Sequence, residues 1–310
     1  MEYRQLGTTP LRISTLGFGA SPLGDVFRQT DPVDRVAAVH LAVDEGINFF
    51  DVSPYYGLTL AETRLGEALE GRREKVVLAT KCGRYGGDEF DFSAARITAG
   101  LEDSLKRLRT DYVDLLQAHD VEFGDVRQIV EETVPTLRKL QQQGKARYIG
   151  ITGYSLKNLM EIASQVKVDN ILSYCRYNLL INDLDTALVP FAKQRGIGVV
   201  NASPLHMGII TERGAPSWHP APRAVHDAGK KVVALCKERG VDASELALRF
   251  CLDYTGAAST LVGMSSTSHL KRNLKSFELQ YDPALLDEIR TLVAPVANTI
   301  WPSGRAENHG

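Results

Sequence analysis

The stretch Asn48-Phe-Phe-Asp-Val-Ser-Pro-Tyr-Tyr56 decides how the fold of this chain is interpreted. Its apolar residues lead into Asp51, and Pro54 forces the chain to leave a sheet soon after that carboxylate. Tyr56 follows Asp51 by five residues, so a carboxylate and a phenol can converge at one rim of the sheet. In parallel α/β barrels, that rim carries the catalytic groups.

Two later stretches end in a similar way. Residues 76–80 are an apolar strand that leads into Lys81, and residues 113–118 are another that leads into His119. A carboxylate, a phenol, an ammonium and an imidazole therefore follow three successive predicted strands. We expect all four groups to meet at one site at the carboxyl ends of these strands.

Strand and helix patterns alternate along the whole chain. The predicted strands cover 16–19, 48–51, 76–80, 113–118, 147–151, 170–174, 197–201 and 259–262. Gly and Pro punctuation predicts a hairpin within residues 3–14. Between the last two strands lie two helical stretches, 222–239 and 243–253, and Asp282-Pro283 opens one more helix. Residues 1–310 thus predict a single (β/α)8 TIM barrel domain with two extra helices.

The composition excludes several classes of protein. The 310 residues are 44% hydrophobic and 24% charged, with a formal net charge of −2, which provides no basic field for nucleic acid. No apolar run approaches the roughly 20 residues of a membrane span. The four cysteines form no CxxC pair, and the seven histidines form no HExxH motif, so no metal site is expected. We expect a cytoplasmic protein, a monomer or weak homodimer, without nucleic-acid or membrane partners.

Several stretches, taken in their order, resemble the aldo-keto reductase superfamily, and among its members most closely the aldose 1-dehydrogenases of the L-galactose and L-fucose type. The resemblance covers nearly the whole chain and implies a barrel whose bottom is plugged by the N-terminal hairpin. It also implies a catalytic tetrad of Asp51, Tyr56, Lys81 and His119. The stretches are 17–24 (GFGASPLG), 48–57, 79–85 (ATKCGRY), 149–153 (IGITG), 171–175 (ILSYC), 202–205 (ASPL), 261–266 (LVGMSS) and 301–304 (WPSG).

Hydride transfer at a carbonyl carbon requires an acid/base group at the attached oxygen, and Tyr56 is the candidate. A free phenol has a pKa near 10, and a neighbouring ammonium lowers it. We expect Lys81 to supply that charge, Asp51 to hold Lys81, and His119 to donate to the substrate oxygen. Tyr55 has the wrong spacing from Asp51 and is interpreted as a pocket residue. A plain salt bridge between Asp51 and Lys81 is the alternative.

The residues expected to hold a cofactor also follow from the resemblance, in which a nicotinamide lies across the barrel mouth. The stretch 17–24 is not a Rossmann G-x-G-x-x-G motif, because its third glycine comes too late. The implied positions lie after the first, fifth, sixth, seventh and eighth strands: Gly19, Thr152, Ser173, Tyr174, Ser203, Leu205, Met207, Gly208, Gly263, Met264, Ser265, His269 and Asn273.

We predict that NAD is preferred over NADP. Relatives that prefer NADP carry a lysine and an arginine where this chain has Gly263 and His269. Phosphate groups are recognised best by arginine and lysine, so the main partners of a 2′-phosphate are missing. Lys271 and Arg272 are the nearby cations that would contradict this prediction.

NAD favours oxidation, and together with this direction the resemblance implies dehydrogenation of an aldose at C1 to the aldonolactone. A sugar requires several hydrogen-bonding groups in a concave pocket. The candidates are Tyr55, Asp120, Glu122 and Trp301, with Arg84 and Tyr85 beside them. Trp218 and His219 are candidates for a lid over the cofactor.

Three other functions stay open at this point. One is an NADPH-dependent aldehyde or ketone reductase of the same fold. Another is a weakly catalytic, cofactor-binding regulatory subunit. The third is a barrel aldolase that uses Lys81 as a Schiff-base amine.

Overall fold

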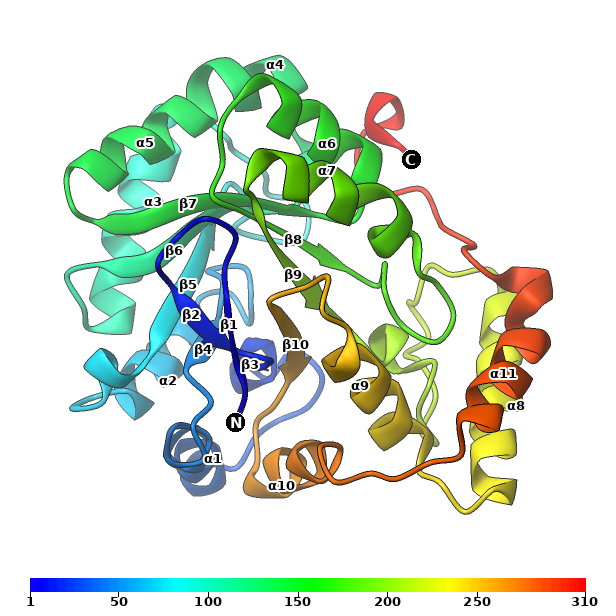
Figure 1. Ribbon diagram of the computed structural model, residues 1–310. Coiled ribbons are helices and arrows are strands. Elements are labelled where there is room, and N and C mark those ends of the chain that lie inside the picture. Colours follow the sequence, from blue (N-terminus) through cyan, green and yellow to red (C-terminus); the bar gives the residue numbers. More distant parts are fainter.

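The computed structural model describes residues 1–310 and contains a closed barrel of eight parallel strands (Figure 1). Closure is complete because the last strand pairs with both the first and the preceding one. The predicted (β/α)8 TIM barrel is confirmed. Its strands are β3 (Leu16–Gly19), β4 (Phe49–Asp51), β5 (Val77–Cys82), β6 (Val113–Ala118), β7 (Ala146–Gly153), β8 (Asn170–Tyr174), β9 (Gly198–Ala202) and β10 (Ser259–Gly263).

Helices surround the barrel, and seven of them begin at a side-chain cap, namely Asp31, Ser93, Asp125, Ser155, Asp242, Ser266 and Asp282. The two extra helices, α8 and α11, pack against each other beside the barrel (Figure 1). The helices are α1 (Pro32–Asp44), α2 (Leu60–Ala68), α3 (Ala94–Leu108), α4 (Val126–Gln128), α5 (Val134–Gln142), α6 (Leu156–Gln165), α7 (Val189–Arg195), α8 (Arg223–Glu238), α9 (Ala243–Asp253), α10 (Thr267–Lys275) and α11 (Pro283–Val293).

Two helices that the sequence predicts as continuous contain a π-helical turn. These turns are Ile129–Thr133, between α4 and α5, and Leu184–Leu188, before α7. In both cases a proline, Pro135 or Pro190, follows within two residues of the turn. Proline cannot donate the i→i−4 hydrogen bond, so the backbone pattern changes ahead of it.

The N-terminal hairpin closes the amino ends of the strands, as predicted. Strands β1 (Tyr3–Gln5) and β2 (Arg12–Ser14) pair antiparallel, and Figure 1 shows them across the near end of the barrel. Gly7 has φ +57°, and a Cβ there would lie 2.3 Å from the backbone nitrogen of Gly198. Only glycine permits this approach. The opposite end, where the strands stop, is therefore the open mouth.

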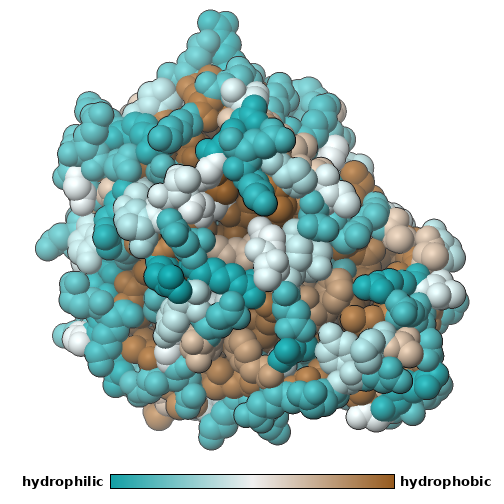
Figure 2. Space-filling model, viewed as in Figure 1, coloured by the Kyte–Doolittle hydropathy of each residue, from teal (hydrophilic) through white to brown (hydrophobic).

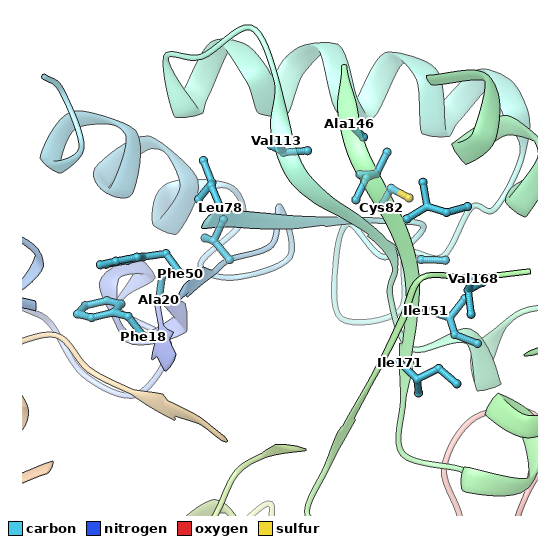
Figure 3. Close-up of a cluster of buried hydrophobic side chains, with 14 of the residues drawn as sticks. Phe18, Ala20, Phe50, Leu78, Cys82, Val113, Ala146, Ile151, Val168 and Ile171 are labelled. Atoms are coloured by element: carbon cyan, nitrogen blue, oxygen red, sulfur yellow. The ribbon is translucent and has the colours of Figure 1, made fainter. Parts of the chain in front are cut away.

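Side chains alternate across each strand and form two apolar layers. Residues on the outer faces, such as Phe50 and Leu78, pack beneath the helices in the main core, part of which Figure 3 shows. Phe18 and Phe50 stack there with ring centroids 5.0 Å apart. Residues on the inner faces, such as Phe49 and Leu115, pack against the hairpin. Near the mouth, the inner faces turn from apolar to polar.

The face that carries the hairpin is mostly hydrophilic, with apolar side chains visible between the polar ones (Figure 2). No helix of the chain has the length and apolar character needed to cross a membrane.

Candidate active site

The four predicted catalytic groups meet at the barrel mouth. The ammonium of Lys81 donates to the carboxylate of Asp51, to the carbonyl oxygen of Val52 at 2.9 Å and to the hydroxyl of Tyr56 at 3.3 Å. The ring of His119 stands nearly perpendicular to that of Tyr56, with centroids 5.6 Å apart. The structure thus brings together all four side chains that the strand ends predicted.

Lys81 is a buried cation whose charge is maintained by its neighbours. Its side chain is only 1% exposed. Burial by itself lowers the pKa of Lys81, but Asp51 and Tyr56 outweigh this effect, so the pKa is raised. The ammonium therefore stays charged at neutral pH beside the phenol.

The net pKa of Tyr56 differs from the expectation. Burial raises the pKa of the phenol to about 12, and the carboxylates of Asp51 and Asp120 add to the rise. Lys81 does lower this pKa, as expected, but its effect is the smaller one. The predicted net lowering is therefore wrong for the free protein, in which the phenol is neutral at neutral pH.

His119 is neutral as well. Burial lowers the pKa of the imidazole to about 3, although Asp120 opposes this effect. The Nδ1 atom lies 3.0 Å from the hydroxyl oxygen of Ser53, and Nε2 lies 3.6 Å from Asp120 Oδ2. When the Ser53 hydroxyl donates to Nδ1, the remaining proton is on Nε2. A neutral imidazole held in this way can donate one hydrogen bond to a substrate oxygen.

A polar wall borders His119. Arg84 donates to Asp120 at 2.5 Å, and its guanidinium lies 3.8 Å from the ring centroid of Tyr55. Asp120 adopts φ +50°, a costly conformation for a residue with a side chain, at a position where the chain leaves β6. Tyr55 and Asp120 thus lie together beside His119, with Arg84 between them. Tyr85 instead donates to the carbonyl oxygen of Arg96 on α3 and lies outside this wall.

Glu122 contacts the C-terminal tail. Its carboxylate accepts from the backbone nitrogen of Tyr154 at 2.9 Å and from the hydroxyl of Ser303 at 3.1 Å. Its carbonyl oxygen accepts from the backbone nitrogen of Arg305 and from Nδ2 of Asn308, each at 2.9 Å. Burial raises the pKa of Glu122 to about 8, with Asp120 adding to the rise. The structure gives Glu122 a role in holding the tail, which the sequence did not indicate.

Trp301 lies in the tail beside the loop that follows β9. Its ring stacks on Tyr154, with centroids 4.3 Å apart, and meets the rings of His206 and His219 at 5.4 Å each. Trp301 is buried, at 7% exposure. It therefore borders the predicted cofactor loop.

The loop after β9 has the properties of a ligand-binding turn. Ser203, His206 and Met207 all have left-handed φ values, between 48° and 59°. Asn178 donates to His206 Nδ1 at 3.0 Å, which leaves the buried Nε2 as a donor without a partner. A strained turn with an unpaired buried donor fits an acceptor-rich group such as a pyrophosphate. Leu205 and Gly208 lie in the same turn.

The other predicted cofactor positions lie at neighbouring strand ends. Gly19 and Gly263 face each other in the register of β3 and β10. The hydroxyl of Thr152 accepts from the backbone nitrogen of Asp120, and the hydroxyl of Ser173 donates to the carbonyl oxygen of Gly153. Both hydroxyls are thus already engaged by the protein. The remaining positions include the half-buried Tyr174, His269 and Asn273 and the buried Met264 and Ser265.

Met264 lies in the main core beneath the helices, so its side chain is directed away from the mouth. Only its backbone can reach a ligand there. Ser266 accepts from the backbone nitrogen of His269 and caps α10, whose N-terminus is a suitable site for an anion.

Comparison with known proteins identifies the family, since the model of the Aldo/keto reductase family matches residues 15–294. The chain belongs to the aldo/keto reductase family. L-galactose dehydrogenase of Arabidopsis thaliana is 47% identical, with 99% of each chain covered. D-threo-aldose 1-dehydrogenase of a Pseudomonas species is 29% identical, covering 90% of this chain and 94% of the relative. A holo aldo-keto reductase structure from Bacillus halodurans has a TM-score of 0.79 and 29% identity, covering both chains fully.

This aldo/keto reductase is thus an NAD(P)-dependent oxidoreductase. One part of its surface was missed by the sequence reasoning. Arg28, from the loop after β3, lies 2.7 Å from Nε2 of His269. The pKa of His269 is lowered by burial first, and then by Arg28, Arg272 and, more weakly, Arg213. No motif signals this cluster, because Arg28 and Arg213 lie far from α10 in the sequence.

The two residues predicted as a lid of this aldo/keto reductase differ from each other. Trp218 is 60% exposed. His219 is buried, and its Nε2 donates to the carbonyl oxygen of His206 at 3.1 Å. His219 therefore supports the loop after β9 through this hydrogen bond, whereas the exposed Trp218 is free to contact solvent or a ligand.

Proposed function

We propose that this aldo/keto reductase is an NAD-dependent aldose 1-dehydrogenase that oxidises the anomeric carbon of sugars of the L-galactose or L-fucose type. The observation that carries the proposal is the contact between Tyr56, Lys81 and Asp51 at the mouth of a barrel that is 47% identical to an L-galactose dehydrogenase over its whole length. The product is the aldonolactone, which forms when C1 loses a hydride and its hydroxyl loses a proton.

Tyr56 takes up the hydroxyl proton, and the bound nicotinamide supplies the hydride acceptor. A phenol must be deprotonated before it can accept a proton, and its pKa of about 12 makes this form scarce at neutral pH. Lys81, 3.3 Å from the hydroxyl, is the group that favours the phenolate. In the reverse direction the neutral phenol is already the required proton donor.

His119 and the polar wall orient the sugar. The Nε2–H group of His119 donates to the anomeric oxygen and holds it beside Tyr56. Arg84 offers donors and Asp120 offers acceptors to the other hydroxyls, while the ring of Tyr55 provides an apolar face. This combination suits a polyol, which needs donors and acceptors at several positions.

The preference for NAD over NADP depends on two opposed features. Gly263 and His269 lack the charge that a 2′-phosphate requires, which favours NAD. Arg28 and Arg213 bring charge to the same place from other loops, which favours NADP. The end of β10 has the greater weight, because a side chain at Gly263 would lie beside the ligand, whereas Arg28 and Arg213 are exposed loop residues.

A comparison of initial rates with NAD and NADP tests the proposal. L-galactose and L-fucose are assayed for oxidation, and a simple aldehyde is assayed for reduction. The proposal requires NAD-dependent sugar oxidation to have the highest kcat/KM. NADPH-dependent aldehyde reduction as the faster reaction would indicate a reductase, and absence of all turnover with either nicotinamide would indicate a regulatory subunit. Borohydride trapping of a substrate on Lys81 would instead indicate an aldolase.

A further inference from the structure

A row of residues crosses the barrel interior at the level of Lys81. The strand registers pair Lys81 of β5 with Gln117 of β6, Gln117 with Gly150 of β7, and Gly150 with Asn170 of β8. Gln117 and Asn170 are completely buried. Two buried amide side chains therefore lie level with Lys81, inside a barrel that is otherwise lined mainly by apolar groups.

The two amides form a chain of hydrogen bonds that ends at Asp51. Nε2 of Gln117 donates to Oδ2 of Asp51 at 3.1 Å, and Nδ2 of Asn170 donates to Oε1 of Gln117 at 2.8 Å. The other carboxylate oxygen, Oδ1, accepts from Lys81. Each oxygen of Asp51 thus has one side-chain partner, and Gln117 is the partner of the second.

Gly150 is what allows this chain to form. It lies between Gln117 and Asn170 in the sheet, and a Cβ at this position would be 2.1 Å from Oδ1 of Asn170. Any other residue would occupy the space through which the Asn170 amide reaches Gln117. The absence of a side chain at Gly150 on β7 therefore allows the amides on β6 and β8 to contact each other.

We propose that Gln117 and Asn170 are positioning residues that keep the Asp51 carboxylate ionised and directed at Lys81. A rotation of the Gln117 amide by half a turn would place its oxygen against the carboxylate, and the Asn170 donor opposes that rotation because it requires an oxygen opposite it. Asn170 acts on Asp51 only through Gln117. The expected loss of sugar oxidation rests on the proposed function, whereas the effect on the ionisation of Asp51 does not.

The amide hydrogen bonds matter because Asp51 is a buried carboxylate with only one cationic partner. Burial raises the pKa of Asp51, and the charge of Lys81, followed by the hydrogen bonds from Lys81 and Gln117, opposes that rise. The titratable groups that face Asp51 are Lys81, from β5, and Tyr56, from the loop after β4. If Gln117 loses its donor, one carboxylate oxygen is left buried without a partner, and the protonated acid is favoured. Lys81 then loses its counter-charge beside the phenol.

The test uses Gln117→Met and Asn170→Leu, which keep the approximate side-chain volume and remove the hydrogen bonds. The matched control is Asn158→Leu, because Asn158 is also completely buried but its amide has no hydrogen-bond partner. The first measurement is the ¹³C carboxyl titration of Asp51 in the full chain without ligand, assigned by comparison with Asp51→Asn. The second is the pH profile of kcat/KM for the sugar.

We expect Gln117→Met to move the Asp51 titration midpoint to higher pH and to lower kcat/KM by about tenfold, with a smaller change in the KM for NAD. Asn170→Leu should act in the same direction but more weakly, and Asn158→Leu should change neither measurement. Gln117→Glu is a second variant that retains the shape, and the added carboxylate should move the midpoint further in the same direction.

An unchanged Asp51 midpoint in Gln117→Met and Gln117→Glu would overturn the positioning role, whatever the activity. An equal shift in Asn158→Leu would also overturn it, because the effect would then follow from any change in the interior. If the midpoint moves as expected but the wild-type protein oxidises no aldose, the positioning role stands and the proposed function fails.

Discussion

Two buried aspartates, one at each end of the barrel, differ in how their charge is balanced. At the closed end, near the start of β6, Asp114 accepts from Arg73 at 2.9 Å, from Arg147 at 3.0 Å and from the backbone nitrogen of Leu78 at 2.9 Å. The Arg147 side chain is 50% exposed, so one of the two cations remains solvated. Two cations and a backbone donor therefore balance a single carboxylate.

At the mouth, Asp51 has less compensation. Its charged partner is Lys81, which is itself buried and also donates to Tyr56. The rest comes from the neutral amide of Gln117. The closed end thus balances one carboxylate with two cations, whereas at the mouth one ammonium is shared between a carboxylate and a phenol.

The largest effect is expected from Tyr56→Phe, which removes the proton acceptor. We expect kcat for sugar oxidation to fall by about 10³-fold, because general acid–base groups contribute on this scale. The free energy of unfolding should change little, since the hydroxyl has one long hydrogen bond, to Lys81. Steady-state kinetics and urea denaturation measure the two quantities. Tyr55→Phe is the matched control, and its kcat should stay within a few-fold of wild type.

For Asp114, at the closed end, we expect a loss of stability without a loss of turnover. Asp114→Ala leaves Arg73 without its buried partner and should lower the free energy of unfolding by about 3 kcal/mol. Turnover per folded molecule should remain near wild type. Urea denaturation with Asp103→Ala as the control tests this, because Asp103 forms an exposed ion pair with Lys106. A loss of turnover without a loss of stability would contradict the comparison.

The pH dependence of oxidation should reveal the neutral phenol. Because the pKa of Tyr56 is about 12, the phenolate fraction rises with pH throughout the neutral and mildly alkaline range. We expect kcat for oxidation to increase by up to about tenfold for each pH unit between 7 and 9, while carbonyl reduction stays flatter. Rates measured in both directions at constant ionic strength test the sign. A plateau reached by pH 7 in the oxidation direction would mean that the phenol is ionised when ligands are bound.

The smallest effect is expected at the rim of the mouth. Arg28→Ser should raise the KM for NADP by a few-fold and leave that for NAD unchanged, because Arg28 lies beside His269, where a 2′-phosphate would bind. Arg127→Ser is a control, since Arg127 is exposed and pairs with Glu131 on its own helical segment. An equal change for the two nicotinamides would remove Arg28 from cofactor discrimination.

The sequence alone determined the barrel and the identity of the four polar groups that meet at its mouth. Strand and helix patterns repeat eight times, and parallel strands place their carboxyl ends at a common rim. Asp51, Lys81 and His119 needed no further information to be placed together, because each ends or directly follows a strand. The position of Tyr56 follows from its spacing of five residues after Asp51.

Tertiary structure alone decided how those groups are charged and supported. The net pKa of Tyr56 depends on burial, which outweighs the single charge that the sequence identified. The amides of Gln117 and Asn170 are 53 positions apart and meet only because Gly150 leaves a gap between their strands. Arg28 reaches His269 across 241 positions. Periodicity and motifs report the local chain, whereas these contacts arise when distant strands and loops close around the same space.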